Sequence, residues 1–138
     1  MTTLIKPELS SKNKYWIDRH RYYELKHFCL QYPSWKKSYA DISNLHVSSV
    51  SEQIRSNISV SDLTAKCAIE KARYSSMIKL VEHTVIEADE DLYLYLLKAV
   101  TEGLSYTHLE NVMGIPCARN TYYDRYRRFF WLLNKVRD

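Results

Sequence analysis

A chain of 138 residues is long enough for one domain, or for a small domain with an appended helical arm. Only two residues are glycine and three are proline, too few for the turns of a strand-rich fold, so the composition predicts an all-α protein with long helices. The net charge of +4 is modest, and no apolar run is long enough to predict a membrane span or a signal peptide.

The charge is unevenly distributed along the chain. Residues 12–40 carry a net +5 and residues 118–138 a net +4, whereas residues 82–102 carry a net −5. Basic ends of this kind favour a polyanionic partner such as nucleic acid. The acidic stretch is interpreted as a solvated helix start or as an internal docking surface for the basic N-terminal region, and a metal site there is disfavoured.

The three cysteines, Cys29, Cys67 and Cys117, are far apart and odd in number. They lack the spacing of zinc ligands, so we expect reduced thiols, a cytoplasmic protein and no metal. No glycine-rich phosphate loop, nucleophile elbow or paired-carboxylate motif is present, and we expect no cofactor and no enzymatic activity.

The first elements in chain order are a flexible tail over residues 1–12 and an aromatic helix that Asn13 caps. Trp16, Tyr23 and Leu30 repeat every seven residues, which predicts an apolar face, and Pro33 ends this helix. Basic residues lie between these aromatics, a combination that also suits single-stranded nucleic acid, but packing in a core or dimer interface is favoured.

A short helix capped by Ser34 is expected to run to about Ile42. The serine-rich stretch 43–60 is then interpreted as a linker, with a short helix at about 48–56 as the alternative. A long helix follows over about 61–87, where apolar residues recur at helical spacing. Residues 13–88 are thus predicted to form a helical N-terminal region.

Residues 89–138 are predicted to form a three-helix module, with Asp89 or Asp91 capping its first helix. Four residues then mark predicted helix boundaries: Gly103, Ser105, Gly114 and Pro116. Glycine ends a helix, serine caps the next, and proline prevents its continuation. A short helix, a glycine turn and a longer basic helix from about 118 to 136 are typical of a helix-turn-helix.

The last helix has two predicted faces. A core stripe runs at spacings of four and three residues: Tyr122, Tyr126, Phe129, Leu133 and Val136. The candidate DNA-binding residues lie on other faces: Arg119, Thr121, Tyr123, Asp124, Arg125, Arg127 and Arg128. A helix fits the major groove, where arginine can bind guanine with two hydrogen bonds or contact phosphates. The alternative is that this basic face is only the solvated side of a structural helix.

The end of the chain contains Gly114-Ile115-Pro116, then residues 119–123 (Arg-Asn-Thr-Tyr-Tyr), then the arginines up to Arg128. This pattern resembles the C-terminal helix-turn-helix of phage transcriptional regulators of the RinA/ArpU type, which are similar to sigma-factor region 4. The aromatic opening is similar to small proteins of Gram-positive phages. Two features depart from the family pattern: the turn before Thr121 is about two residues longer, and Glu110 stands where an alanine is usual. The resemblance implies a phage or prophage regulator in the host cytoplasm, with host transcription machinery as a further partner.

Sequence-specific binding to double-stranded DNA is therefore the leading prediction, with a homodimer that reads two half-sites. The tyrosine-rich N-terminal region is the predicted dimer surface. Three other classes remain open from the sequence. The first is a phage small terminase subunit, which would form a ring. The second is a protein-binding module, such as an inhibitor of a host factor. The third is an enzyme whose site is assembled only in the fold, although no motif points to one.

Overall fold

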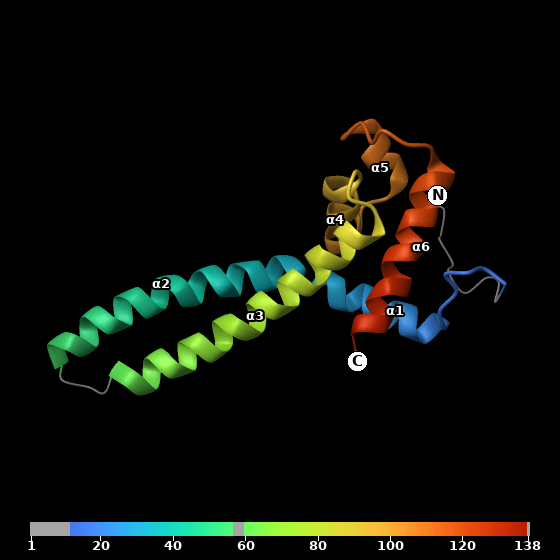
Figure 1. Ribbon diagram of the computed structural model, residues 1–138. Helices are drawn as coiled ribbons and strands as arrows, with labels where there is room; N and C mark the ends of the chain where they lie inside the picture. Colours follow the sequence, from blue (N-terminus) through green and yellow to red (C-terminus); the bar gives the residue numbers. More distant parts are fainter. Residues whose placement is uncertain (1–11, 57–59, 138) are drawn as a thin grey trace. The chain divides into compact units, whose positions relative to one another are not determined.

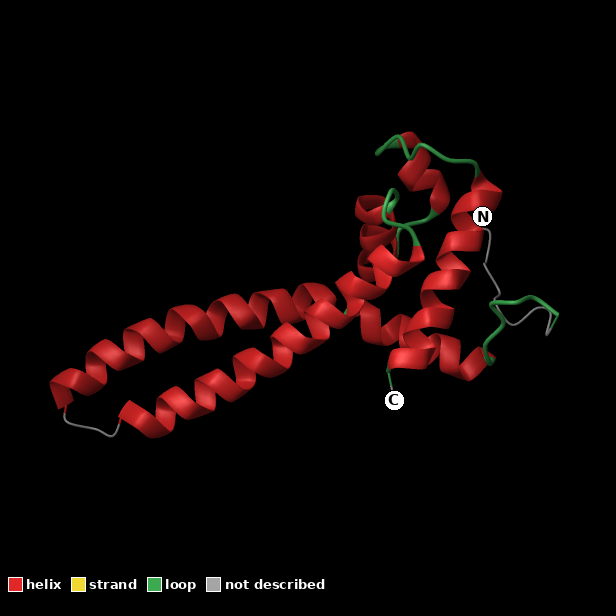
Figure 2. Ribbon diagram, viewed as in Figure 1, coloured by secondary structure: helices red, strands yellow, loops and turns green. Residues whose placement is uncertain are grey.

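The computed structural model describes residues 12–56 and 60–137, and all regular structure in these ranges is helical (Figures 1 and 2). The prediction of an all-α protein is confirmed for these residues. No helix within them is sufficiently long and apolar to cross a membrane. The predicted tail lies outside the described residues except for Lys12. The helices are α1 (Arg19–Leu30), α2 (Tyr32–Ser56), α3 (Val60–Ala88), α4 (Tyr93–Glu102), α5 (Tyr106–Asn111) and α6 (Arg119–Val136).

The chain divides into two compact units, described separately below. The first unit comprises residues 1–31 and 81–138, and the second unit comprises residues 32–80. The first unit therefore contains α1 and the last turns of α3 in addition to the C-terminal helices.

Helix α1 begins at Arg19, so the predicted start at Asn13 is wrong. The Asp18 carboxylate caps the helix by accepting hydrogen bonds from the backbone N–H groups of His20 (3.0 Å) and Arg21 (3.4 Å). Asn13 instead accepts from the Tyr15 N–H (2.8 Å) and closes a local turn. Asparagine and aspartate can both cap a helix, and here Asp18 does so.

The later start changes which face of α1 is buried. Tyr23 and Leu30 are 36–37% exposed, and Trp16, at 39%, precedes the helix. The predicted apolar face is therefore wrong. The buried residues of α1 are Tyr22, Leu25, Phe28 and Cys29.

In the second unit, α2 continues to Ser56, so the predicted linker is wrong over residues 43–56, while residues 57–59 lie outside the described residues. Pro33 lies in the first turn of α2, where its missing N–H costs nothing. Helix α3 spans Val60–Ala88, within one residue of the expected range at each end. The Nζ of Lys71 on α3 lies 5.1 Å from the ring centroid of Tyr39 on α2.

The core of the first unit lies where α1 packs against both α4 and α6 (Figure 1). Phe129, Phe130 and Leu133 on α6 are fully buried. The hydroxyl oxygens of Tyr22 on α1 and Tyr126 on α6 lie 2.6 Å apart and share a buried hydrogen bond. Burial is the main reason that the pKa of Tyr126 is well above its ordinary value, so its hydroxyl stays neutral and available to this bond.

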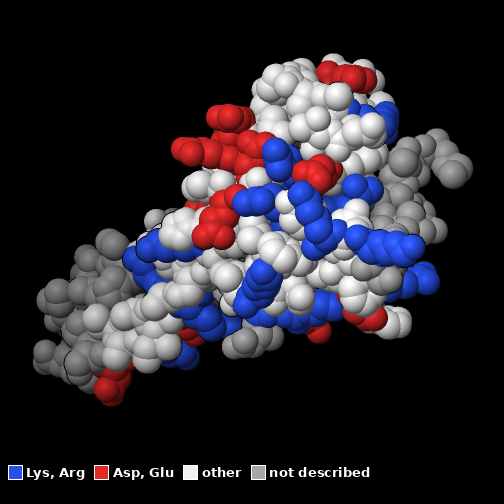
Figure 3. All heavy atoms as spheres, turned by 45° about the vertical axis from the view of Figure 1, so that its right-hand side comes forward, with Lys and Arg blue, Asp and Glu red and all other residues white. Residues whose placement is uncertain are grey.

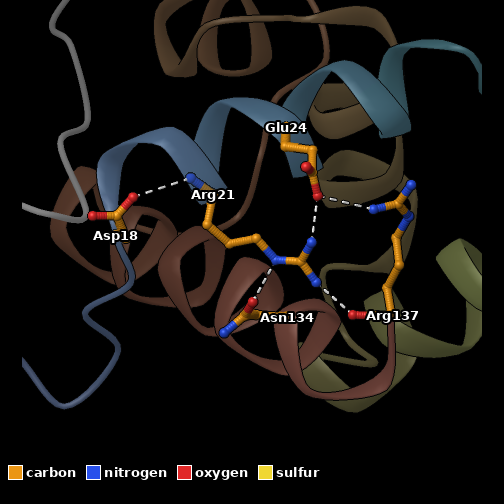
Figure 4. A network of polar contacts seen from close by, with 5 residues as sticks. All are labelled: Asp18, Arg21, Glu24, Asn134 and Arg137. Atoms are coloured by element: carbon orange, nitrogen blue, oxygen red, sulfur yellow. Dashed lines mark hydrogen bonds and ion pairs between the residues drawn. The ribbon is translucent and has the colours of Figure 1, made fainter.

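A polar network ties the C-terminal end of α6 to α1 (Figure 4). Arg21 on α1 donates from Nε to the Asn134 side-chain oxygen (2.7 Å) and from Nη2 to the Arg137 carbonyl (2.5 Å). The Glu24 carboxylate binds both Arg21 and Arg137. These contacts hold the C-terminal end of α6 against α1, beside the buried residues that set the orientation of α6.

The glycine after α5 is held in a left-handed conformation, with φ of 64° at Gly114. A side chain there meets open space, so only backbone strain opposes substitution. We expect Gly114→Ala to lower the free energy of unfolding by about 1–2 kcal/mol, and Gly114→Asn to cost less because asparagine tolerates this conformation. Urea unfolding of the two variants tests this. Equal losses would contradict the strain account.

Candidate nucleic-acid interface

Three helix boundaries of the C-terminal module lie at the predicted residues. Gly103, with φ of 72°, ends α4, and the Ser105 hydroxyl caps α5 by accepting from the His108 N–H (3.2 Å). After α5, Gly114 adopts a positive φ, and the N–H of the following residue, Ile115, donates to the Leu109 carbonyl (3.1 Å). This bond satisfies a carbonyl at the C-terminal end of α5. Helix α6 begins at Arg119, one residue from its predicted start.

The turn between α5 and α6 covers residues 112–118 and is anchored to the core. Ile115 is buried, and the Tyr106 hydroxyl on α5 donates to the Cys117 carbonyl (2.7 Å). The Tyr106 ring also lies 5.5 Å from the Tyr122 ring on α6. The turn is thus attached to the core through Ile115 and to α5 through the Cys117 carbonyl.

The predicted core stripe of α6 is correct over four of its five residues. Tyr122, Tyr126, Phe129 and Leu133 are buried, and Phe130 joins them. Val136 is 54% exposed, so its assignment to the core is wrong. It is the last residue of α6, where the neighbouring contacts to α1 are the polar ones of Asn134 and Arg137.

Opposite this stripe, the N-terminal half of α6 presents polar side chains to solvent. Asn120 and Thr121 are exposed, and Asp124 and Arg127 are partly exposed. On the flank, Arg119 lies with its Cζ 4.9 Å from the Tyr106 ring centroid and donates from Nη1 to the Tyr123 hydroxyl (2.9 Å). The structure therefore places the predicted site residues Arg119, Thr121, Tyr123, Asp124 and Arg127 in the first half of α6, with Asn120, which was not predicted, beside them.

Two other predicted contacts are engaged within the molecule. Arg125 donates from Nε to the Asp89 carboxylate (3.1 Å) and lies 3.3 Å from the Asp124 carboxylate. Asp89 also accepts from the Leu92 N–H (3.2 Å), so this ion pair connects α6 to the start of α4. The N-cap of α4 is Leu92, which forms no side-chain capping bond, so the predicted capping of α4 by Asp89 or Asp91 is wrong.

Arg128 is likewise held by neighbouring groups. It donates to the Tyr15 hydroxyl (3.4 Å) and to the Glu87 carbonyl (3.3 Å), while its buried Nε has no hydrogen-bond partner in the described part of the chain. The hydrogen bond from Arg128 is the largest cause lowering the pKa of Tyr15. Arg128 therefore holds the segment around Tyr15 against α6.

A double-mutant cycle on Asp89 and Arg125 measures how much this ion pair stabilises the first unit. Because the pair is only partly buried, we expect a coupling free energy of about 1 kcal/mol in urea unfolding, reduced at high salt. Asp89→Asn, Arg125→Ala and the double variant supply the cycle. Strictly additive losses would show that the ion pair does not stabilise the unit.

In Figure 3, basic side chains run in a broad band across the middle of the face shown, and the largest group of acidic side chains lies above this band. Within residues 12–56 and 60–137, no group of three His, Cys, Asp or Glu side chains is placed to hold a metal ion. Burial raises the pKa of the Cys29 thiol to about 12, so that thiol is not activated as a nucleophile. The chemistry of this face is that of hydrogen bonding and positive charge.

Sequence reasoning missed four residues of this face: Lys14, Asn120, Trp131 and Lys135. Trp131 and Lys135 are one turn apart on α6, a spacing that is visible in the sequence. Lys14 comes from a segment more than a hundred residues away, so no local pattern signals its position. No family model, curated protein or solved structure matches this chain.

Proposed function

We propose that the first unit binds duplex DNA with the N-terminal half of α6 in the major groove. The observation that carries this proposal is the position of Asn120, Thr121, Asp124 and Arg127, on the solvent side of a helix whose opposite side is the core. A helix presented in this way can enter a groove about 12 Å wide without disturbing the fold.

The chemistry of these side chains suits base edges and phosphates. Arg127 can bind guanine with two hydrogen bonds, and Asn120 can do the same with adenine. Arg119, on the flank, is placed for a phosphate contact. Arg125 and Arg128 act mainly by holding α6 against its neighbours, since both bind groups of the same unit.

The biological role that we propose is transcriptional regulation in a phage or prophage, in the cytoplasm of the host bacterium. It rests on the resemblance of residues 114–128 to regulators of the RinA/ArpU type. One short reading helix gives limited specificity, so we propose a homodimer on two half-sites. Light scattering at micromolar concentration tests this, and a monomer would contradict the homodimer.

Duplex binding is tested by a salt titration of the wild-type protein on a fluorescent mixed-sequence duplex of about 30 base pairs. Phosphate contacts release counterions, so the logarithm of the binding constant should fall linearly with the logarithm of the salt concentration. We expect micromolar binding at low salt that weakens steeply between about 50 and 200 mM. Absence of saturable binding at low salt would overturn the proposal.

A further inference from the structure

Two lysines lie over a pair of packed aromatic rings on the face that contains α6. The Lys135 Nζ is 3.4 Å from the Trp131 ring centroid, and the Lys14 Nζ is 4.9 Å from the Tyr15 ring centroid. The Trp131 and Tyr15 rings are 5.5 Å apart and meet edge to face. Each ammonium group is attracted by the ring beneath it, which holds both charges near the surface of α6.

Arg128 completes this basic–aromatic cluster, defined by Lys14, Tyr15, Arg128, Trp131 and Lys135. Its guanidinium donates to the Tyr15 hydroxyl, which joins residues 12–18 to α6. The described residues place no carboxylate within ion-pair distance of any of the three cations. Three positive charges are thus gathered without an ion pair among the described residues, although Asp124 lies one helical turn before Arg128, and an external anion would stabilise such a group.

The position of the cluster on α6 indicates which anion fits. Eighteen helical residues extend over about 27 Å, more than twice the width of a major groove. If the first half of α6 lies in the groove, its second half must pass over the neighbouring phosphate strand. The α6 members of the cluster, Arg128, Trp131 and Lys135, lie on that second half, and Tyr15 packs against Trp131.

We propose that the basic–aromatic cluster is a second DNA contact, which binds phosphate oxygens of the same duplex independently of base sequence. This inference rests on the proposed function, since it uses the orientation of α6 in the groove. It assigns to residues 12–18 a role in clamping the backbone. Lys14 and Lys135 supply the phosphate contacts, and the aromatic pair holds them in place.

The test compares Lys14→Ala/Lys135→Ala with the wild type in the salt titration on the mixed-sequence duplex. Each lost phosphate contact should reduce the slope by about 0.9, so we expect a reduction of about 1.8 and an affinity loss of tenfold or more at about 100 mM salt. Lys14→Arg/Lys135→Arg keeps both charges and should restore most of the slope. Both lysines are exposed, and circular dichroism confirms that the variants fold.

Lys66→Ala/Lys79→Ala is the matched control, because it removes two exposed lysines from the second unit. It should leave the slope within experimental error. If the wild type binds duplex DNA while Lys14→Ala/Lys135→Ala keeps the full slope, the cluster is not a phosphate contact. A larger loss on single-stranded oligothymidine than on the duplex would also overturn the inference. Failure of the wild type to bind at all is a different result, which would reject the proposed function and the inference together.

Discussion

Phe130→Ala is expected to lower the free energy of unfolding of the first unit by about 3–5 kcal/mol. Phe130 is fully buried, and its ring centroid lies 5.1 Å from that of Tyr22 on α1 and 4.9 Å from those of Tyr126 and Phe129 on α6. Removing the ring leaves a cavity among side chains that also hold the Tyr22–Tyr126 hydrogen bond. The loss combines the lost burial of the ring with this cavity.

Urea unfolding followed by circular dichroism measures this loss. Val136→Ala is the matched control, because it truncates an apolar residue on the same helix that is 54% exposed. We expect the control to change stability by less than about 0.5 kcal/mol. Similar losses for the two variants would mean that α6 does not pack on α1 through Phe130.

Arg119→Ala/Arg127→Ala is expected to weaken duplex binding by about 10- to 100-fold, since each arginine contact with a base or a phosphate contributes on the order of 1 kcal/mol or more. Both side chains project from the first half of α6 and neither forms an ion pair among the described residues. Arg119 donates to Tyr123, so a small loss of stability is expected as well.

Anisotropy titrations at about 100 mM salt measure this change, again with Lys66→Ala/Lys79→Ala as the control of equal charge. The unfolding free energy of each variant separates weakened binding from weakened folding. An affinity equal to that of the control would indicate that the first half of α6 does not face DNA, and that its basic side is merely solvated.

The helix boundaries of the C-terminal module were predictable because short-range chemistry sets them. Gly103 and Gly114 adopt positive φ at helix ends, and Ser105 binds a backbone N–H three residues ahead. Each of these effects depends on residues within one turn. The same reasoning failed at Asn13, because Asn13 and Asp18 can both cap a helix and only the packing of the unit decides between them.

The serine-rich part of α2 shows why polar composition misled the linker prediction. Ser43 donates its hydroxyl to the Tyr39 carbonyl one turn earlier (2.9 Å), so its polar group is satisfied inside the helix. Serine lowers helix propensity only modestly, and tertiary context overrides that difference. A helix therefore continues where the sequence suggested a break.

The sequence predicted which face of α6 forms the candidate site. It did not predict which side chains on that face bind other residues of the same unit. The spacing of Tyr122, Tyr126 and Phe129 identifies the buried side of α6, and hence the outer side. Arg125 binds Asp89, which is 36 residues away in the sequence, and Arg128 binds Tyr15, which is 113 residues away. No periodicity encodes such pairs, because they form only when the segments before α1 and before α4 pack against α6.

Selection of binding sites from a pool of random-sequence duplexes tests whether α6 reads base sequence. We expect the wild-type protein to enrich a short motif, present as two half-sites about one helical turn apart if it binds as a dimer. We also expect Arg119→Ala/Arg127→Ala to relax or abolish this motif. A wild-type selection that yields no enriched sequence would contradict sequence-specific reading by α6.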